Sequence, residues 1–296
     1  MTRLSLPHDP RWFQIAVLSA LLVYGVAALD FEVRGGIAAV ILATALGVQA
    51  LADRLGGRRF EPKSALISAL SLCLLLRTPS PMLAAAAAAI SIGSKPLIRI
   101  GGKHVFNPSN LGLVVVVLAS ERAWISPGQW GNAALGAFAF VCLGSLVVRR
   151  AARSDVTWAF LAFWVAALFG RAAWLGDPPA IPLHQLASGS LLLFAFFMIS
   201  DPKTTPDSRA GRIVFAALVA AVGAWIVFGL HRPAGPILAL VACSPLVPLI
   251  DRLLPGPKYR WGAPGATAGA SPKPAAGPVA EARPRTVPAL VPSTET

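Results

Sequence analysis

Residues 64–81 read SALISALSLCLLLRTPSP and residues 188–206 read SGSLLLFAFFMISDPKTTP, and these two stretches determine the architecture of the chain. Each stretch begins with small residues, continues as an apolar run and ends in polar residues and proline. Both apolar runs are short for a membrane-spanning helix, which needs about 20 mostly apolar residues. Short or interrupted helices at matching positions of two halves are typical of membrane proteins built from repeats.

A second pair of similar segments also occupies matching positions in the two halves of the chain. Residues 103–108 precede one apolar segment, and residues 231–233 precede another in the second half. With five spans in each half, an odd number, the second copy must lie upside down relative to the first. The sequence therefore predicts an inverted repeat, with the site at the broken helices between the halves.

The composition of the 296 residues indicates an integral membrane protein. Hydrophobic residues make up 55% and charged residues only 13%, and the mean hydropathy is +0.66. An ordinary soluble chain is about 25% charged. We therefore expect an all-α integral membrane protein, and the apolar segments predict about ten transmembrane helices, at residues 12–29, 35–52, 64–76, 82–92, 108–120, 129–148, 157–175, 183–200, 211–230 and 234–254.

The positive charges support this count. With the N-terminus in the cytoplasm, 21 of the 26 Lys and Arg residues fall on the cytoplasmic side, as the positive-inside rule requires. We expect a multi-pass protein of the bacterial plasma membrane, with both termini cytoplasmic. The first apolar run also fits a cleaved signal peptide, with residues 26–28 as a passable cleavage site, which would leave nine spans.

The predicted domain organisation has two parts. Residues 1–254 form the transmembrane domain, whose inverted halves cover about 12–122 and 129–254. Residues 255–296 are rich in Pro, Ala and Gly and cannot bury enough apolar surface to fold, so we expect a disordered cytoplasmic tail.

Several classes of function are excluded or disfavoured. The net charge of +13 does not indicate nucleic acid binding, because the charges lie in short runs between apolar segments rather than on one water-facing surface. Cys73, Cys142 and Cys243 all lie in apolar stretches without metal-ligand spacing, so we expect no metal site. No series of acidic residues crosses the spans, which disfavours a simple proton pump.

The first candidate site is the loop between the fourth and fifth spans. Gly101 and Gly102 permit close approach of backbone to a ligand. Lys103 and His104 offer positive or donor groups, and the amides of Asn107 and Asn110 can recognise a polar ring edge. Pro108 follows Asn107 and suits a helix start whose N–H groups face an anion. The same residues also fit an ordinary positively charged loop that ends in a helix cap.

The second candidate segment follows the apolar run of residues 191–199. Asp201 lies close to the hydrocarbon boundary, where a carboxylate is costly unless it is paired. Lys203 or a residue of the first loop can neutralise it, and Thr204 and Thr205 add hydroxyl groups. The segment also fits a plain helix C-terminus with hydrated charges.

Three motifs resemble a known family, RnfD/NqrB, which comprises the membrane D protein of Rnf electron-transport complexes and the homologous B protein of the sodium-translocating NADH:quinone oxidoreductase. Residues 92–108 are similar to the family's glycine–lysine–Asn-Pro loop, and residues 195–206, AFFMISDPKTTP, to its segment containing Ser/Thr-Asp-Pro. The third motif is residues 248–251, PLID, which close the last helix. The resemblance covers roughly residues 62–254.

This resemblance implies a ten-helix inverted-repeat protein that binds flavin and passes electrons across the membrane, coupled in some complexes to sodium or proton movement. The family carries a covalent flavin on a Ser/Thr-Gly-Ala-Thr motif after the fifth span. Residues 120–128, SERAWISPG, lack that motif. We therefore expect a non-covalent flavin (FMN or riboflavin), a compact stand-alone relative, and redox partner proteins that carry flavin or another redox centre.

The leading hypothesis is a membrane subunit that relays electrons through this flavin. Its predicted cofactor-binding residues are Lys103, His104, Asn107, Pro108, Asn110, Asp201, Lys203, Thr204 and Thr205. Alternatives from other classes are a secondary transporter or small-molecule channel, and a membrane anchor for a redox or biosynthetic partner. An oxidoreductase activity is left open, as are the electron donor and acceptor.

Overall fold

The computed structural model describes residues 9–28, 32–126 and 154–259. All of them lie in one unit, Met1–Ala266. This part of the chain is helical apart from two very short sheets. A helix satisfies its backbone N–H and C=O groups internally, which is what a lipid environment demands of a chain this apolar.

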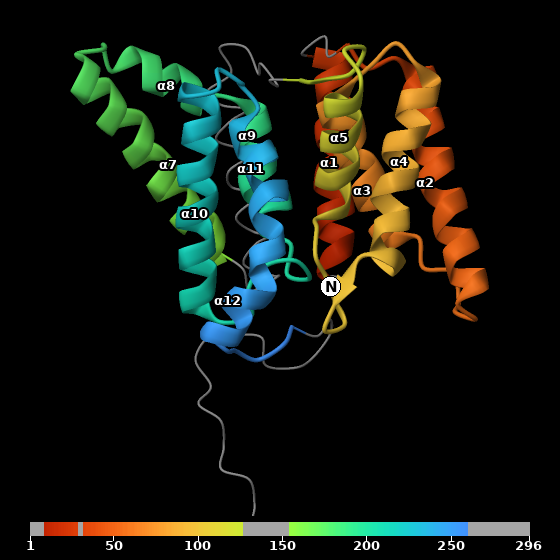
Figure 1. Cartoon of the computed structure of the whole chain (residues 1–296). Helices are drawn as coiled ribbons and strands as arrows, with labels where there is room; N and C mark the ends of the chain where they lie inside the picture. The colour runs from red at the N-terminus through yellow and green to blue at the C-terminus, as the bar shows by residue number, and fades with distance from the viewer. Residues whose placement is uncertain (1–8, 29–31, 127–153, 260–296) are drawn as a thin grey trace, which may run out of the picture. The chain divides into compact units, whose positions relative to one another are not determined.

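The first half consists of five helices that pack in a regular order. Helix α2 packs against α4, α4 packs against α5, and α3 lies against both α1 and α2 (Figure 1). The helices are α1 (Pro10–Ala28), α2 (Gly35–Leu55), α3 (Lys63–Leu75), α4 (Pro81–Leu97) and α5 (Pro108–Ala119).

Two small antiparallel sheets mark opposite ends of this half (Figure 1). Strand β1 (Leu76–Arg77), which follows α3, pairs with β4 (Trp124–Ile125) after α5. Strand β2 (Arg99–Ile100) pairs with β3 (Lys103–His104). The two residues between β2 and β3 are Gly101 and Gly102, with φ of 60° and 82°. Two positive φ angles are what a two-residue hairpin turn requires, so the glycines serve this turn.

In the second half, α7 packs against α10 and α10 against α11, and α11 also contacts α5 of the first half. The π-helical turn η1 continues α9 without a break. The described elements of this half are α7 (Ser154–Leu175), α8 (Ala180–Leu186), α9 (Gly189–Leu193), η1 (Phe194–Met198), α10 (Arg209–Phe228), α11 (Gly235–Cys243), η2 (Ser244–Leu246) and α12 (Val247–Leu253).

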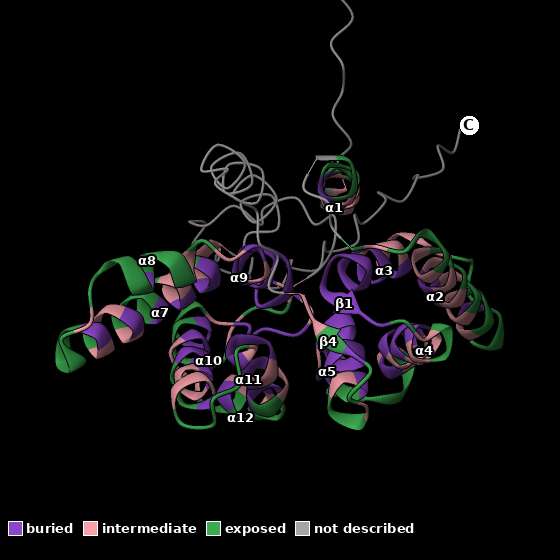
Figure 2. Cartoon of the chain, turned by 90° about the horizontal axis from the view of Figure 1, so that it is seen from above, coloured by how far each residue is buried: buried purple, intermediate pink, exposed green. Residues whose placement is uncertain are grey.

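The two stretches at 64–81 and 188–206 form short helices, as predicted, and the structure shows that both are buried. In α3, every residue from 68 to 75 is buried, and in α9 and η1 every residue from 191 to 198 is buried. Figure 2 shows both helices as mostly buried segments. A helix that is apolar all round and buried all round belongs to the interior of a bundle, and a π-helical turn often lies at a functional site.

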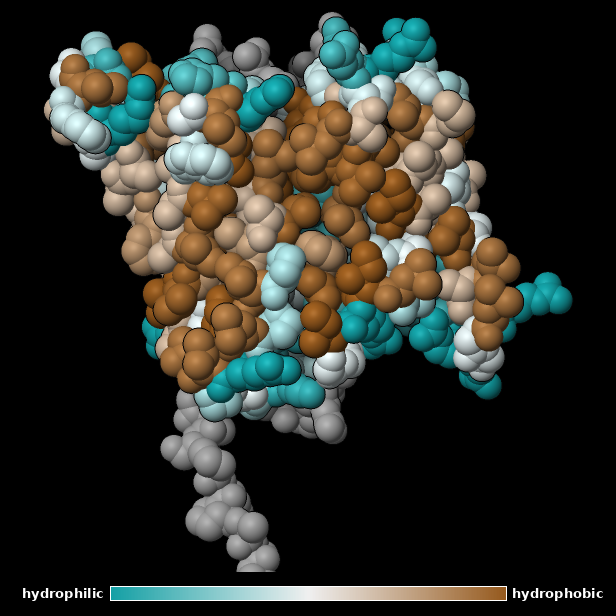
Figure 3. Space-filling model, in the orientation of Figure 1, coloured by the Kyte–Doolittle hydropathy of each residue, from teal (hydrophilic) through white to brown (hydrophobic). Residues whose placement is uncertain are grey.

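The membrane character is confirmed. Within the described residues, four helices are long and apolar enough to cross a membrane: Gly35–Leu55, Ser154–Leu175, Arg209–Phe228 and Gly235–Leu253. Shorter apolar helices accompany them, among them Lys63–Leu75, Pro108–Ala119 and Gly189–Met198. Apolar side chains cover most of the middle of the face in Figure 3, with hydrophilic side chains gathered towards its two ends. The chain is therefore a multi-pass membrane protein.

Two predicted spans are not single regular helices. The segment predicted at 183–200 is divided into α8, α9 and η1, because Ser188 takes an extended conformation (φ −77°, ψ 124°). The segment predicted at 234–254 passes through the 3-10 turn η2, which contains Pro245. Proline has no N–H to donate and disturbs the regular helix there. The predicted span 129–148 and most of the predicted tail, from residue 260, lie outside the described residues.

Close glycine contacts fix the packing in both halves. A Cβ on Gly112 of α5 would collide with the Ala87 carbonyl and the Ser91 hydroxyl of α4. A Cβ on Gly235, at the start of α11, would collide with the Gly223 carbonyl of α10. Small residues of this kind let helix backbones approach closely in membranes.

Candidate functional site

The β2–β3 hairpin joins the first half to the second through Lys103. The Lys103 ammonium lies 2.9 Å from Asp207 Oδ1 and 2.9 Å from Asp251 Oδ2. The backbone N–H of Asp207 donates to Asp251 Oδ1 at 2.7 Å. Two carboxylates held this close require a shared counter-cation, and Lys103 supplies it from a sequence distance of more than a hundred residues.

The Asn-Pro pair begins α5 and contacts the end of η1. Asn107 Oδ1 accepts the Asn110 N–H at 3.1 Å and the Ser109 hydroxyl at 2.9 Å, which is an N-cap. The Asn107 side-chain amide donates to the Met198 carbonyl at 3.3 Å and to Asp201 Oδ2 at 3.4 Å. The two predicted site segments, separate in sequence, therefore meet at this side chain, next to Pro108.

The segment after η1 is a compact turn around Asp201. The Lys203 N–H donates to Asp201 Oδ1 at 3.0 Å. The hydroxyls of Thr204 and Thr205 donate to the Asp201 carbonyl at 3.4 and 3.0 Å. Both threonines are buried, whereas Asp201 and Lys203 are partly exposed. The carboxylate is therefore satisfied by the first loop and by its own turn together.

His104 faces α4. Its Nδ1 lies 3.0 Å from the Lys95 carbonyl, and because a carbonyl can only accept, Nδ1 carries the proton and Nε2 is left as an acceptor. Burial lowers the pKa of His104 to about 4, and the positive charges of Arg99 and Lys95 act in the same direction. The imidazole is thus neutral at physiological pH and does not provide a positive charge.

Asn110 lies where the first turns of α5 and α11 meet. Its side-chain amide donates to the Ile237 carbonyl at 3.1 Å. The residue is 1% exposed, and its Oδ1 has no hydrogen-bond partner in the part of the chain that the structure describes. A buried acceptor without a donor costs stability, so this oxygen is the atom of the cluster best suited to receive a donor from a bound molecule.

Sequence reasoning missed several charged residues that support this cluster. The Asp155 carboxylate of α7 accepts hydrogen bonds from Arg212 Nε, at 2.9 Å, and from Arg212 Nη2. Arg212 also donates to the Asp207 carbonyl at 2.7 Å. On the other side, Lys95 donates to the carbonyl and hydroxyl of Ser64 at 3.1 and 3.0 Å. Their position in the sequence could have identified them. A charged residue within or beside an apolar helix is costly in free energy, so it needs a partner.

Among the predicted site residues, the structure therefore brings Lys103, Asn107 and Asn110 into contact with the second half, and it joins Asn107 to Asp201. It turns His104 towards its own half. This arrangement defines the class of protein: it is a multi-pass membrane protein. A cluster of polar side chains lies between its two sets of helices, where the short buried helices end.

Comparison with known proteins confirms the resemblance seen in the motifs. Residues 125–259 match the sequence model of the NQR2, RnfD, RnfE family, a little under half of the chain. The D protein of the ion-translocating oxidoreductase complex from Stutzerimonas stutzeri is 44% identical over 75 residues, 24% of this chain and 20% of that protein. The protein of the same name from Escherichia coli O1:K1 / APEC is 33% identical over 133 residues, 44% of this chain and 32% of that protein.

Over residues 125–259 the chain is thus similar to the NQR2, RnfD, RnfE family. The aligned part of the chain spans a third or less of the length of these curated relatives. The family match includes residues 195–206 and 248–251, and it does not reach the loop at 92–108.

Proposed function

We propose that this chain is a subunit of a membrane electron-transport complex and relays electrons through a non-covalently bound flavin. The curated relatives are named as subunits of an ion-translocating oxidoreductase complex. The observation that carries the proposal is the contact of Asn107 with Met198 and Asp201, because it brings the two family-like segments to one place. The proposed location of the protein is the bacterial plasma membrane, with both termini in the cytoplasm.

The proposed architecture is ten transmembrane helices in two inverted halves. The packing order α2–α4–α5 of the first half has a counterpart in the order α7–α10–α11 of the second. The central contact between the halves is α5 against α11, and each of these helices carries a tight glycine contact, Gly112 and Gly235. Helix α3 and the α9–η1 segment are then the corresponding short, buried helices.

The chemistry of the cluster fits a flavin ring. An isoalloxazine has a planar apolar body, carbonyl acceptors and one imide N–H donor. Asn110 Oδ1 is a buried acceptor that lacks a donor among the described residues, and the partly exposed Lys203 can donate to a ring carbonyl or a phosphate. When bound, the flavin would supply one- and two-electron transfer.

The remaining predicted residues have supporting roles in this proposal. Lys103 holds the β2–β3 hairpin against Asp207 and Asp251. Asn107 fixes the start of α5, with Pro108 as its first residue. His104 presents a neutral acceptor nitrogen, while Thr204 and Thr205 stabilise the turn that places Asp201. Redox proteins that carry a flavin or another centre would deliver and remove the electrons on the two sides.

The test is the absorption spectrum of the purified full-length protein in detergent, extended by quantification of released flavin. We expect the yellow flavin band, retained after gel filtration and lost on acid denaturation because the attachment is non-covalent. Asn110→Ala and Asp201→Ala should lower flavin occupancy severalfold. The matched control is Gln185→Ala, which removes an exposed amide from α8.

A folded preparation that contains no flavin overturns the proposal, and so does unchanged occupancy in both site variants. Uptake or efflux by flavin-free protein in liposomes would then favour the transporter alternative, and the absence of transport would favour a membrane anchor.

A further inference from the structure

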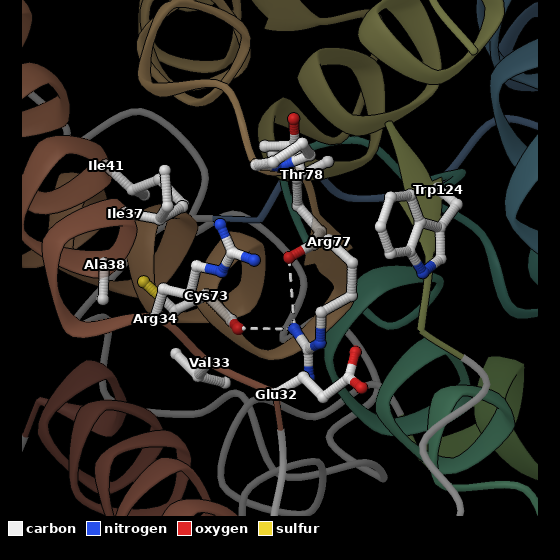
Figure 4. A pocket seen from close by; sticks show the side chains of 12 residues that line it. Glu32, Val33, Arg34, Ile37, Ala38, Ile41, Cys73, Arg77, Thr78 and Trp124 are labelled. Carbon is white, nitrogen blue, oxygen red and sulfur yellow. Dashed lines mark hydrogen bonds between the residues drawn. The ribbon is translucent and has the colours of Figure 1, made fainter. Parts of the chain in front are cut away.

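A cavity lies wholly within the first half (Figure 4). Its lining residues belong to the end of the helices where β1 pairs with β4, which is opposite the β2–β3 hairpin that carries Lys103 (Figure 1). The cavity has a volume of about 380 Å³, within the range of small ligand sites. Its walls come from the start of α2, the end of α3 with β1, and β4. None of the predicted flavin-binding residues lines it.

Two guanidinium groups give the cavity its charge. Arg77 is 6% exposed, and its Nη1 donates to the carbonyls of Cys73 and Leu76 at 3.1 Å each, which fixes the side chain at the C-terminus of α3. Arg34 directly precedes α2 and is exposed. Figure 4 shows both guanidinium groups reaching into the space between α2, α3 and β4. A pair of this kind is suited to a phosphate or carboxylate oxygen pair.

The charge balance selects the type of anion. Among the described residues, the acid that lines the cavity is Glu32, whose carboxylate interacts electrostatically with Arg77 and lies beside it in Figure 4. Glu32 therefore offsets the charge of Arg77, and Arg34 gives the described part of the lining one excess positive charge. This favours a monoanion such as a phosphodiester over a dianionic phosphate monoester.

The remaining walls indicate that the anion carries an apolar part. Ile37 and Ile41 of α2 line the cavity, and only 11% of the apolar window of α2 is buried, so this helix faces lipid. Trp124, 47% exposed, stands at the other side of the cavity. Arginine and tryptophan at the end of an apolar helix are the residues that meet lipid headgroups at the membrane interface.

We infer that this cavity binds the phosphodiester headgroup of an anionic glycerophospholipid, with Arg34 and Arg77 holding the phosphate and an acyl chain along the apolar face of α2. The site is independent of the proposed flavin site, since it shares no residue with it. Such a lipid would brace α2 against the end of α3, one of the two short buried helices.

Native mass spectrometry of the purified full-length protein tests the inference. With phosphatidylglycerol added, we expect one retained lipid, and phosphatidylcholine, which has no net charge, should bind at least tenfold more weakly. Arg34→Gln should lower phosphatidylglycerol binding about tenfold, because one charge-assisted contact is lost, and Arg34→Lys should restore most of it. The matched control is Arg122→Gln, an exposed arginine of the loop before β4 that does not line the cavity.

Equal binding of the two lipids, or equal loss in Arg34→Gln and Arg122→Gln, would overturn the assignment. Competition separates a lipid from a free anion. We expect millimolar inorganic phosphate or glycerol 3-phosphate to leave the bound phosphatidylglycerol in place, and displacement by either would show a soluble-anion site instead. All variants alter exposed side chains, so their gel-filtration profiles should match the unmodified protein.

Discussion

Lys103 is the residue on which the contact between the hairpin and the second half depends. Its ammonium is the cation that Asp207 and Asp251 share, 2.9 Å from each. Lys103→Met should therefore leave the two neighbouring carboxylates without a counter-cation. We expect the free energy of unfolding to fall by about 2 kcal/mol, which is typical for the loss of hydrogen bonds to charged groups. Thermal unfolding in detergent, followed by tryptophan fluorescence, measures this loss.

The control for Lys103 is Arg54→Met, which removes a positive charge from the exposed last turn of α2 and should leave the unfolding temperature nearly unchanged. Adding Asp251→Asn to Lys103→Met removes one of the two repelling charges, so it should recover part of the stability. No recovery would mean that the carboxylates do not repel each other and that the lysine acts by packing alone.

His104 makes the second prediction at the residue scale, a dependence of stability on pH. Burial and the charges of Arg99 and Lys95 lower its pKa to about 4 in the folded protein, whereas the unfolded chain keeps a value near 6.5. The unfolded state therefore binds a proton more readily, so stability is complete above pH 6.5 and falls as the pH decreases towards 4. His104→Gln should flatten this part of the stability curve.

Unfolding temperatures between pH 7 and pH 4 measure that slope. The matched variant is His184→Gln, which replaces an exposed histidine of α8 and should follow the unmodified protein. If His104→Gln and the unmodified protein lose stability in parallel, the acid sensitivity belongs to other groups.

At the scale of elements, the contact of α5 with α4 depends on Gly112. A methyl group there would overlap the Ala87 carbonyl and the Ser91 hydroxyl, and overpacking of this type costs about 1–3 kcal/mol. Gly112→Ala should therefore destabilise the protein and push α5, with Asn107 and Asn110, away from its position. Gly47→Ala in α2, which has open space at its Cβ, should be neutral or stabilising by up to about 1 kcal/mol. Thermal unfolding of the two alanine variants compares them directly.

The helices also show which structural features a sequence pattern can predict and which it cannot. Apolar runs with small residues and terminal prolines were enough to predict α3 and the α9–η1 segment, because length and composition restrict a buried membrane helix. The break at Ser188 was not predictable, since it depends on a backbone conformation that many residues can adopt. Gly101 and Gly102 were assigned to ligand approach, but their positive φ angles serve the hairpin turn.

At the scale of the whole chain, the sequence predicted which segments meet but not which atoms do. Asn107 and Asp201 were placed in one site, and they are in contact. The partners of Lys103 could not be derived, because nothing local indicates that its side chain reaches two carboxylates more than a hundred residues away. The type of a residue determines which hydrogen bonds its side chain can donate or accept. Its actual partners depend on how the two halves pack, here with α5 against α11.

The final prediction concerns the path of the chain through the membrane. Trp124 in β4 pairs with Arg77 at one end of the helices, whereas Asp155 at the start of α7 pairs with Arg212 at the end where Lys103 lies. Two positions only about thirty residues apart should therefore face opposite sides of the membrane, as a span between them requires.

Single cysteines at Arg122 and Ser154, introduced after the three native cysteines are replaced by alanine, report this path. A membrane-impermeant maleimide added to intact cells should label Arg122→Cys, and it should label Ser154→Cys only after the cells are opened. Labelling of both positions from the same side would remove the sixth span. The second half would then run in the same sense as the first, and the inverted repeat, with the flavin site placed between its halves, would have to be abandoned.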